Sequence, residues 1–192
     1  KRPISNQDVL DFLVANYKKI QIGKPDKRFS YSNTNYALLA LIIEKASGQS
    51  YSNYLRQSIF EPFNMKDTYA YTTADSARSL KSFFQNGKPY AFDYLDNVYG
   101  DKNIYSTVRD LLKWDQALYG GRYLRRQTLD SAYMGYSFEK PGIHNYGLGW
   151  RLFLLDNHKK FIYHNGWWHG NRTAFYRLPD DNATIIALSN ND

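Results

Sequence analysis

Residues 31–55 read YSNTNYALLALIIEKASGQSYSNYL, and this stretch gives the clearest indication of the fold. Apolar side chains recur with helical spacing from residue 33 to residue 46, which predicts a helix buried on most of its sides. Gly48 is typical of the residue that ends such a helix. A second helix is expected over residues 50–62. The polar run Tyr31-Ser32-Asn33 therefore lies at the N-terminal end of a predicted helix with a clear apolar periodicity.

Two further helices are expected on either side of this stretch. Ser5 is a good N-cap for a helix whose apolar face includes Val9 and Leu13, and Ile4 and Val9 are spaced as a hydrophobic staple. Residues 66–104 are polar and aromatic with little periodicity, so we expect a long irregular excursion there. A capped, amphipathic pattern over residues 106–118 then predicts another helix.

Strand-like patterns occupy the last part of the chain, at 146–155, 160–164, 172–178 and 183–189, with a turn at 179–182. We expect an antiparallel sheet of about three strands after a helical region, which is an α+β arrangement. Residues 1–145 would form the mainly helical region and residues 146–192 the strands. Together they would make one incomplete catalytic domain, because such a small sheet leaves an edge and a face without cover.

Two motifs could carry chemistry. Tyr31-Ser32-Asn33 could simply cap a helix, yet a tyrosine at a helix mouth can also relay a proton in acyl transfer. The amide of Asn33 can bind a substrate carbonyl. His164-Asn165-Gly166 ends a strand-like run, and a lone histidine there is also compatible with a structural hydrogen bond. The residues alone leave both interpretations open.

Longer stretches around these motifs carry a family resemblance. Residues 31–55, followed by IFEPFNMKDT at 59–68, closely resemble the region of the Tyr-x-Asn motif in the serine β-lactamase and penicillin-binding-protein family. YSTVRDLLKWDQAL at 105–118 resembles a later helix of that family. YGLGWRL at 146–152 and YHNGWWHGNRTAFYRLPDDNATIIALSN at 163–190 resemble its closing strands. The family includes class C β-lactamases, D-Ala-D-Ala peptidases and related esterases.

The resemblance implies roles for six residues. Tyr31, Asn33 and His164 would be the catalytic residues, with His164 in the place of the lysine of the Lys-Thr-Gly motif. Asn165, Gly166 and Trp167 would bind substrate, and the N–H of Trp167 would donate to the oxyanion. The family's reaction acylates a serine that a nearby lysine deprotonates.

The Ser-x-x-Lys motif that holds this nucleophile has no credible counterpart here. The only match to the pattern is Ser137 to Lys140, and Pro141 after it disfavours a helical lysine. Ser106 to Arg109 offers an arginine, which cannot act as a base, and is better explained as a helix cap. We therefore expect a C-terminal piece of a longer hydrolase, whose nucleophile would belong to a missing N-terminal segment.

The composition and charge limit the kinds of partner that the chain is expected to bind. The chain of 192 residues has a formal charge of +7, but its 25 Lys and Arg are scattered, which argues against a nucleic-acid surface. The sequence has no cysteine, its four histidines lack metal-ligand spacing, and no apolar run is long enough to span a membrane. We expect no cofactor and no metal. The resemblance implies an exported, periplasmic or cell-envelope protein.

The sequence thus predicts a member of a serine hydrolase family that cleaves an amide or ester bond through an acyl-enzyme. The substrate would be a β-lactam, a D-Ala-D-Ala peptide or a small ester. This chain by itself would be inactive because the nucleophile is missing. The alternative is a non-catalytic module that binds a cell-wall peptide or a protein partner.

Overall fold

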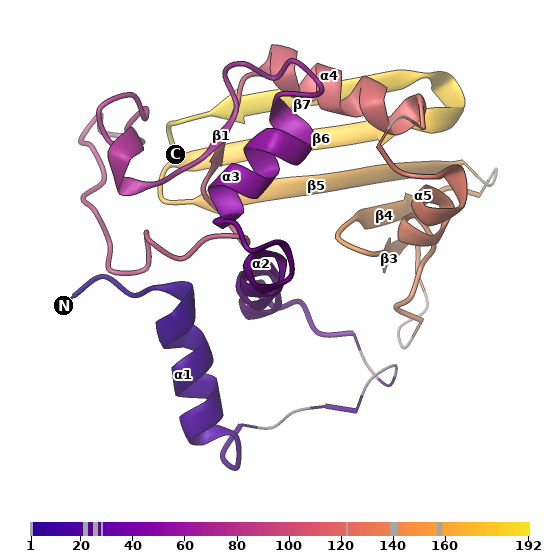
Figure 1. Cartoon of the computed structure of the whole chain (residues 1–192). Helices are drawn as coiled ribbons and strands as arrows, with labels where there is room; N and C mark the ends of the chain where they lie inside the picture. Colours follow the sequence, from indigo (N-terminus) through magenta and orange to yellow (C-terminus); the bar gives the residue numbers. More distant parts are fainter. Residues whose placement is uncertain are drawn as a thin grey trace. The chain divides into compact units, whose positions relative to one another are not determined.

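The computed structural model describes residues 2–20, 23–24, 27, 29–121, 123–138, 142–156 and 159–192 (Figure 1). These residues form two compact units. The helical unit comprises Lys1–Lys81 with Pro89–Ser106, and the sheet unit comprises Ser82–Lys88 with Thr107–Asp192. The prediction that 1–145 and 146–192 make one incomplete catalytic domain stays a prediction.

The helical unit contains three α-helices, one π-helical turn, one 3-10 turn and a two-stranded ladder among its described residues. In chain order they are α1 (Asn6–Asn16), α2 (Asn33–Ser47), α3 (Tyr51–Leu55), η1 (Arg56–Phe60), β1 (Tyr69–Ala70), η2 (Thr73–Asp75) and β2 (Ile104–Tyr105). The expected helix over 50–62 is confirmed, although its second half adopts the π-helical turn η1.

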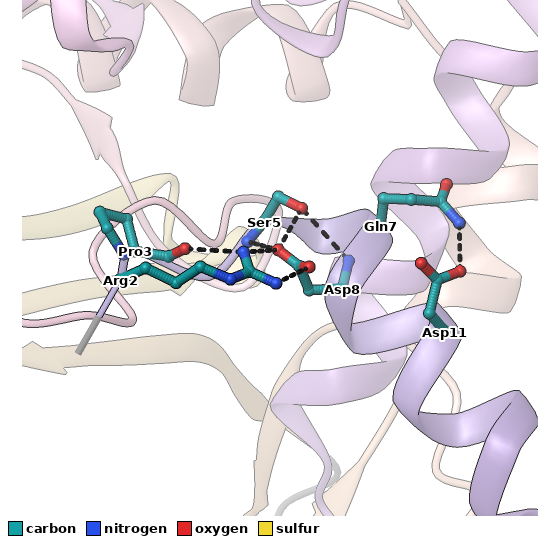
Figure 2. A network of polar contacts seen from close by, with 6 residues as sticks. All are labelled: Arg2, Pro3, Ser5, Gln7, Asp8 and Asp11. Carbon is teal, nitrogen blue, oxygen red and sulfur yellow. Dashed lines mark hydrogen bonds and ion pairs between the residues drawn. The ribbon is translucent and has the colours of Figure 1, made fainter.

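Ser5 begins α1 through a capping box, as the sequence predicts (Figure 2). The backbone N–H of Asp8 donates to the Ser5 hydroxyl at 3.2 Å, and the Asp8 carboxylate accepts from the Ser5 backbone N–H at 2.8 Å. Arg2 donates two further bonds to the same carboxylate. These donors, with the Arg2 bond first, hold the pKa of Asp8 below its usual value. The start of the chain's first helix is therefore fixed locally.

The buried residue of α1 is a polar one, which the expected apolar face does not include. Asn6 is 1% exposed, and its amide donates to the carbonyls of Ala37 and Tyr99 at 2.9 and 2.8 Å. Its Oδ1 accepts from the Tyr99 N–H at 3.0 Å. Asn6 thus links α1, α2 and the segment before β2, and a buried amide is tolerated because its donors and acceptor are used.

The prediction that α2 is buried on most sides is wrong. Its buried residues are Ala37 and Ala40, whereas Leu39 and Ile42 are 49% and 58% exposed. The buried stripe consists of small residues because the backbone at Gly100 approaches it closely. A Cβ atom at Gly100 would lie 2.5 Å from the carbonyl oxygen of Tyr36 and 2.8 Å from the Ala40 Cβ. The predicted stop at Gly48 is confirmed.

We expect Gly100→Ala to lower the free energy of unfolding by about 2–5 kcal/mol, the sum of overpacking against α2 and of a positive φ on a residue with a Cβ. Gly48→Ala is the matched control, since Gly48 has a φ of +70° against +94° at Gly100 but nothing within 4 Å of its added Cβ. Its cost should be about 1–2 kcal/mol. Urea denaturation followed by circular dichroism measures both, and equal losses would show that the close approach is unimportant.

Among its described residues, the sheet unit contains two helices, a 3-10 turn and a five-stranded antiparallel sheet. Its elements are α4 (Val108–Tyr119), α5 (Arg126–Ala132), β3 (His144–Tyr146), β4 (Arg151–Leu154), β5 (Lys160–Trp168), β6 (Asn171–Leu178), η3 (Pro179–Asp181) and β7 (Ala183–Ser189). The strands lie in sequence order, β3-β4-β5-β6-β7, and α4 packs on β7 (Figure 1). The α+β class is confirmed.

The sheet differs from the expected one of about three strands in two respects. The run expected at 146–155 is a hairpin, because the chain turns after Tyr146 and the Gly147 N–H donates to the Trp150 carbonyl at 2.7 Å. The following strand, β5, also continues to Trp168 instead of ending at His164, and it pairs with β6 along that extension. The predicted turn at 179–182 is confirmed as η3, closed by Asn182 with a φ of 48°.

Within the sheet unit, an apolar core and a buried ion pair join the helices to the sheet. The core residues are Leu118, Leu129, Tyr133, Leu152 and Ile162. Beside them Arg177 of β6, which is 1% exposed, donates to the Asp115 carboxylate of α4 at 2.5 Å and to the Tyr133 hydroxyl. Thr184 of β7 donates to the other Asp115 oxygen at 2.8 Å. This pair anchors α4 to the two last strands.

The segment Ser82–Lys88 interrupts the helical unit and belongs to the sheet unit. The Phe83 N–H donates to the Asn190 carbonyl at 2.8 Å, and the Asp192 N–H donates to the Phe83 carbonyl at 3.1 Å. Gly170 fits against Phe83 because a Cβ there would lie 2.3 Å from the Phe83 carbonyl oxygen. The expected irregular excursion over 66–104 is thus held in part by contacts to residues far along the chain.

Candidate active site

The Tyr-x-Asn motif lies at the N-terminal end of α2 in the helical unit. Ser32 is the N-cap, with an extended backbone and no side-chain capping bond, and Asn33 is the first helical residue. The side chain of Tyr31 is 46% exposed, and Asn33 is exposed as well. Because Ser32 does not cap the helix with its hydroxyl, helix capping does not account for the polar run, and both candidate side chains can be reached from solvent.

The four residues His164 to Trp167 lie together on β5 of the sheet unit. Successive side chains of a strand point to opposite faces, so His164 and Gly166 share one face and Asn165 and Trp167 share the other. Strand β4 pairs with β5 only from Lys160 to Tyr163, whereas β6 pairs with it as far as Trp168. The motif thus begins where the sheet narrows to one neighbouring strand.

His164 is held by hydrogen bonds at both ring nitrogens. Its Nδ1 lies 2.8 Å from the carbonyl oxygen of Asn165, and its Nε2 lies 3.0 Å from the hydroxyl of Tyr146. Burial lowers the pKa of His164 below the ordinary value, and the positive charge of Arg151 lowers it further, while the bond to the Asn165 carbonyl opposes both. The imidazole is therefore biased toward its neutral form.

Gly166 is required by its cross-strand partner. A Cβ at this position would lie 2.3 Å from the Thr173 hydroxyl oxygen on β6. An alanine would therefore force Thr173 to another rotamer. In this unit the Thr173 side chain of β6 approaches Gly166 closely, and a Cβ atom at Gly166 would press on it.

Trp167 and Asn165 border an open hollow on the sheet. Trp167 is 76% exposed, its indole N–H donates to the His169 carbonyl at 3.1 Å, and the Arg172 guanidinium stacks over its ring at 4.5 Å. The Asn165 amide donates to the Tyr176 hydroxyl at 3.3 Å. The hollow has a volume of about 470 Å³, and its lining includes both residues and Gly166. The small residues Ala174 and Ala187 also line it.

Three other positions, Ser106, Ser137 and Tyr146, bear on the sequence predictions. Thr107, the residue after Ser106, is the N-cap of α4, and the Ser106 hydroxyl lies 2.8 Å from that of Thr68. Of the Ser137-x-x-Lys140 match, Glu139, Lys140 and the following Pro141 lie outside the described residues. Sequence reasoning missed Tyr146 as the partner of His164, since nothing in YGLGWRL signals a bond to a residue on another strand.

The structure places the predicted residues in two sets, one in each unit. Tyr31 and Asn33 lie together at the start of α2, and His164, Asn165, Gly166 and Trp167 lie together on β5. The prediction that the two sets converge on one cleft stays a prediction.

Comparison with known proteins identifies the protein family to which the chain belongs. The family described as Beta-lactamase matches residues 2–192, so the chain belongs to the β-lactamase family. It is 32% identical to penicillin-binding protein 4* of Bacillus subtilis (strain 168) over 97% of its own length and 45% of that protein. The chain therefore spans less than half the length of this relative, and it matches the C-terminal part of such proteins.

Solved structures show the same fold. The octameric penicillin-binding protein homologue from Pyrococcus abyssi superposes with a TM-score of 0.82 at 24% identity, covering 97% of this chain and 44% of that one. The D-amino acid amidase from Ochrobactrum anthropi SV3 gives a TM-score of 0.76 at 24% identity, covering 100% of this chain and 63% of that one. The β-lactamase-like fold expected from the sequence is confirmed.

Within the described ranges no helix combines the length and the apolar character needed to cross a membrane. Among the same residues no group of three or more His, Asp or Glu side chains is arranged to hold a metal ion.

Proposed function

We propose that the protein containing this chain is a serine hydrolase that cleaves an amide or ester bond through an acyl-enzyme. The observation that carries the proposal is the match to the β-lactamase family over residues 2–192, which includes both motifs. Its relatives include penicillin-binding protein 4* of Bacillus subtilis, and a D-amino acid amidase shares its fold. A β-lactam, a D-Ala-D-Ala peptide or a small ester is the proposed substrate class.

Four motif residues have a role in this proposal. The Tyr31 phenol relays a proton to or from the serine and the leaving group, and the Asn33 amide binds the acyl-side carbonyl. On β5 the N–H of Trp167 is one donor to the oxyanion, and His164 supplies a hydrogen-bonding side chain beside it. The substrate would lie along the side of residues 164–168 that does not pair with β6. No metal or cofactor takes part in this route.

The nucleophile is proposed to come from a segment outside these 192 residues. The chain's only Ser-x-x-Lys, at Ser137, precedes a proline and lies between the α4–α5 region and the sheet. A serine begins the reaction in this scheme, so the chain alone keeps only binding groups and part of the oxyanion hole. By analogy with penicillin-binding protein 4*, a cell-envelope location is proposed.

The test compares this chain with the protein encoded by the whole reading frame that contains it. Both are treated with a fluorescent penicillin and with a fluorophosphonate, and intact mass reports any adduct. We expect the whole protein to form a stoichiometric adduct on a serine outside residues 1–192, and the chain to form none. An adduct on the isolated chain would contradict the missing nucleophile. Saturable binding of a muropeptide by a whole protein that neither probe labels would favour the binding module instead.

A further inference from the structure

The contacts of His164 define its tautomer. A carbonyl oxygen can only accept a hydrogen bond, so the 2.8 Å contact with Asn165 requires the proton to be on Nδ1. In the neutral ring Nε2 then carries no proton, and at 3.0 Å it accepts from the Tyr146 hydroxyl. The two contacts are consistent with one arrangement of protons in the neutral ring.

The tyrosine in this pair is firmly placed. Tyr146 is 9% exposed, and its ring meets the imidazole edge-on, with centroids 6.1 Å apart and an interplanar angle of 89°. Its backbone carbonyl accepts from the Tyr136 N–H at 2.9 Å, and its own N–H donates to the Asn145 side chain at 2.8 Å. A hydroxyl on so well-fixed a ring can hold the orientation of its partner.

The effect of the pair reaches the main chain of the motif. The carbonyl of Asn165 and the N–H of Gly166 belong to one planar peptide unit, so fixing the carbonyl also fixes the direction of the N–H. The Nδ1–H of His164 binds that carbonyl. The orientation of the Asn165–Gly166 peptide is thereby coupled to the imidazole, and the imidazole is coupled to Tyr146.

We propose that Tyr146 is a positioning residue for the His-x-Gly strand, which holds His164 with its proton on Nδ1 and through it orients the Asn165–Gly166 peptide. The proposal deepens the proposed function, because the oriented strand is the one on which substrate would lie. It also refines the role of His164. A substrate carboxylate only accepts hydrogen bonds, so it gains nothing from an unprotonated Nε2, and His164 acts here by accepting and by positioning.

The first test is spectroscopic and needs no activity. Long-range ¹H–¹⁵N correlation spectra of the ¹⁵N-labelled chain report which nitrogen of each histidine is protonated, and a His164→Gln variant assigns the signal. Above the titration of the ring we expect a protonated Nδ1 and a bare Nε2. A wild-type His164 with its proton on Nε2 would overturn the proposal, whatever the variants do.

The second test removes one oxygen atom. Tyr146→Phe should give a mixture of His164 tautomers and shift the Gly166 amide resonance. Tyr136→Phe is the matched control, because its hydroxyl donates to the Ser131 carbonyl at 2.9 Å and lies on the same unit. It should change neither signal. An unchanged tautomer and an unchanged Gly166 resonance in a folded Tyr146→Phe variant would contradict the coupling.

A kinetic readout in the whole protein separates this inference from the proposed function. There Tyr146→Phe should slow acylation about tenfold, the size expected for one hydrogen bond, and Tyr136→Phe should not. A whole protein that forms no acyl-enzyme at all would refute the proposed function, while the tautomer of His164 would still decide the positioning role.

Discussion

Asp115→Ala should lower the free energy of unfolding by about 3–5 kcal/mol, the cost of leaving a buried charge without its partner. Arg177 is 1% exposed, and Asp115 accepts from its Nε at 2.5 Å and from the Thr184 hydroxyl at 2.8 Å. Without the carboxylate, the guanidinium keeps the hydroxyl of Tyr133 as a partner and the face of the Tyr119 ring, 4.5 Å away. Neither of these neutral groups compensates a buried positive charge.

Urea denaturation measures this effect, with circular dichroism and tryptophan fluorescence as two probes, since Trp114 and Trp150 pack against the core of the same unit. Asp130→Ala is the control. Its partner Arg126 is 85% exposed and Asp130 itself 56%, so its loss should cost at most about 1 kcal/mol. A paired Asp115→Leu and Arg177→Met variant should recover most of the loss, because no unpaired charge remains. Equal losses for Asp115→Ala and Asp130→Ala would contradict the buried pair.

Tyr31→Phe should slow acylation of the whole protein by about 10² to 10⁴-fold, the range that general acid–base groups contribute. The expectation rests on the proposed function, in which the phenol hydroxyl relays the proton of the missing serine. Tyr31 is 46% exposed at the open end of α2, so removing its oxygen should leave the stability of the helix nearly unchanged. Stopped-flow or quenched labelling with the fluorescent penicillin gives the acylation rate.

Tyr17→Phe provides the control for this substitution. Tyr17 is 60% exposed and follows α1 in the same helical unit, so the variant makes the same chemical change on a similar surface. Its acylation rate should equal that of the unmodified protein. A Tyr31→Phe protein that acylates as fast as the Tyr17→Phe protein would remove Tyr31 from the mechanism and leave the family assignment intact.

The starts and ends of helices could be predicted from the sequence because their signals are local. Ser5 and Gly48 act within one turn of the residues that they cap, so their neighbours in the sequence are sufficient to identify them. The burial of α2 could not be predicted, since its inner face is chosen by the approach of Gly100, which is distant in sequence. Helix α5 was also not predicted from the sequence, and its seven residues offer too short a period to detect.

The difference between local signals and contacts from distant parts of the sequence applies to the candidate site as well. The motif residues are adjacent in sequence, so both motifs were predicted and lie where a helix begins and where a strand runs. The partner of His164 was not predicted, because Tyr146 reaches it across a hairpin that the pattern over 146–155 does not reveal. Residue types identify candidate chemistry, whereas the bonds that set a tautomer come from the topology of the sheet.

Residues 82–88 have a consequence for biosynthesis. Ribosomes make the chain from its N-terminus, and the hydrogen-bonding partners of Phe83 are Asn190 and Asp192. During translation this short stretch therefore lacks its final hydrogen-bonding partners until residues 190–192 have emerged from the ribosome. Contacts so distant along the chain form slowly. Ser82–Lys88 is accordingly a stretch that a chaperone or a protease could reach while residues 89–189 are still being made.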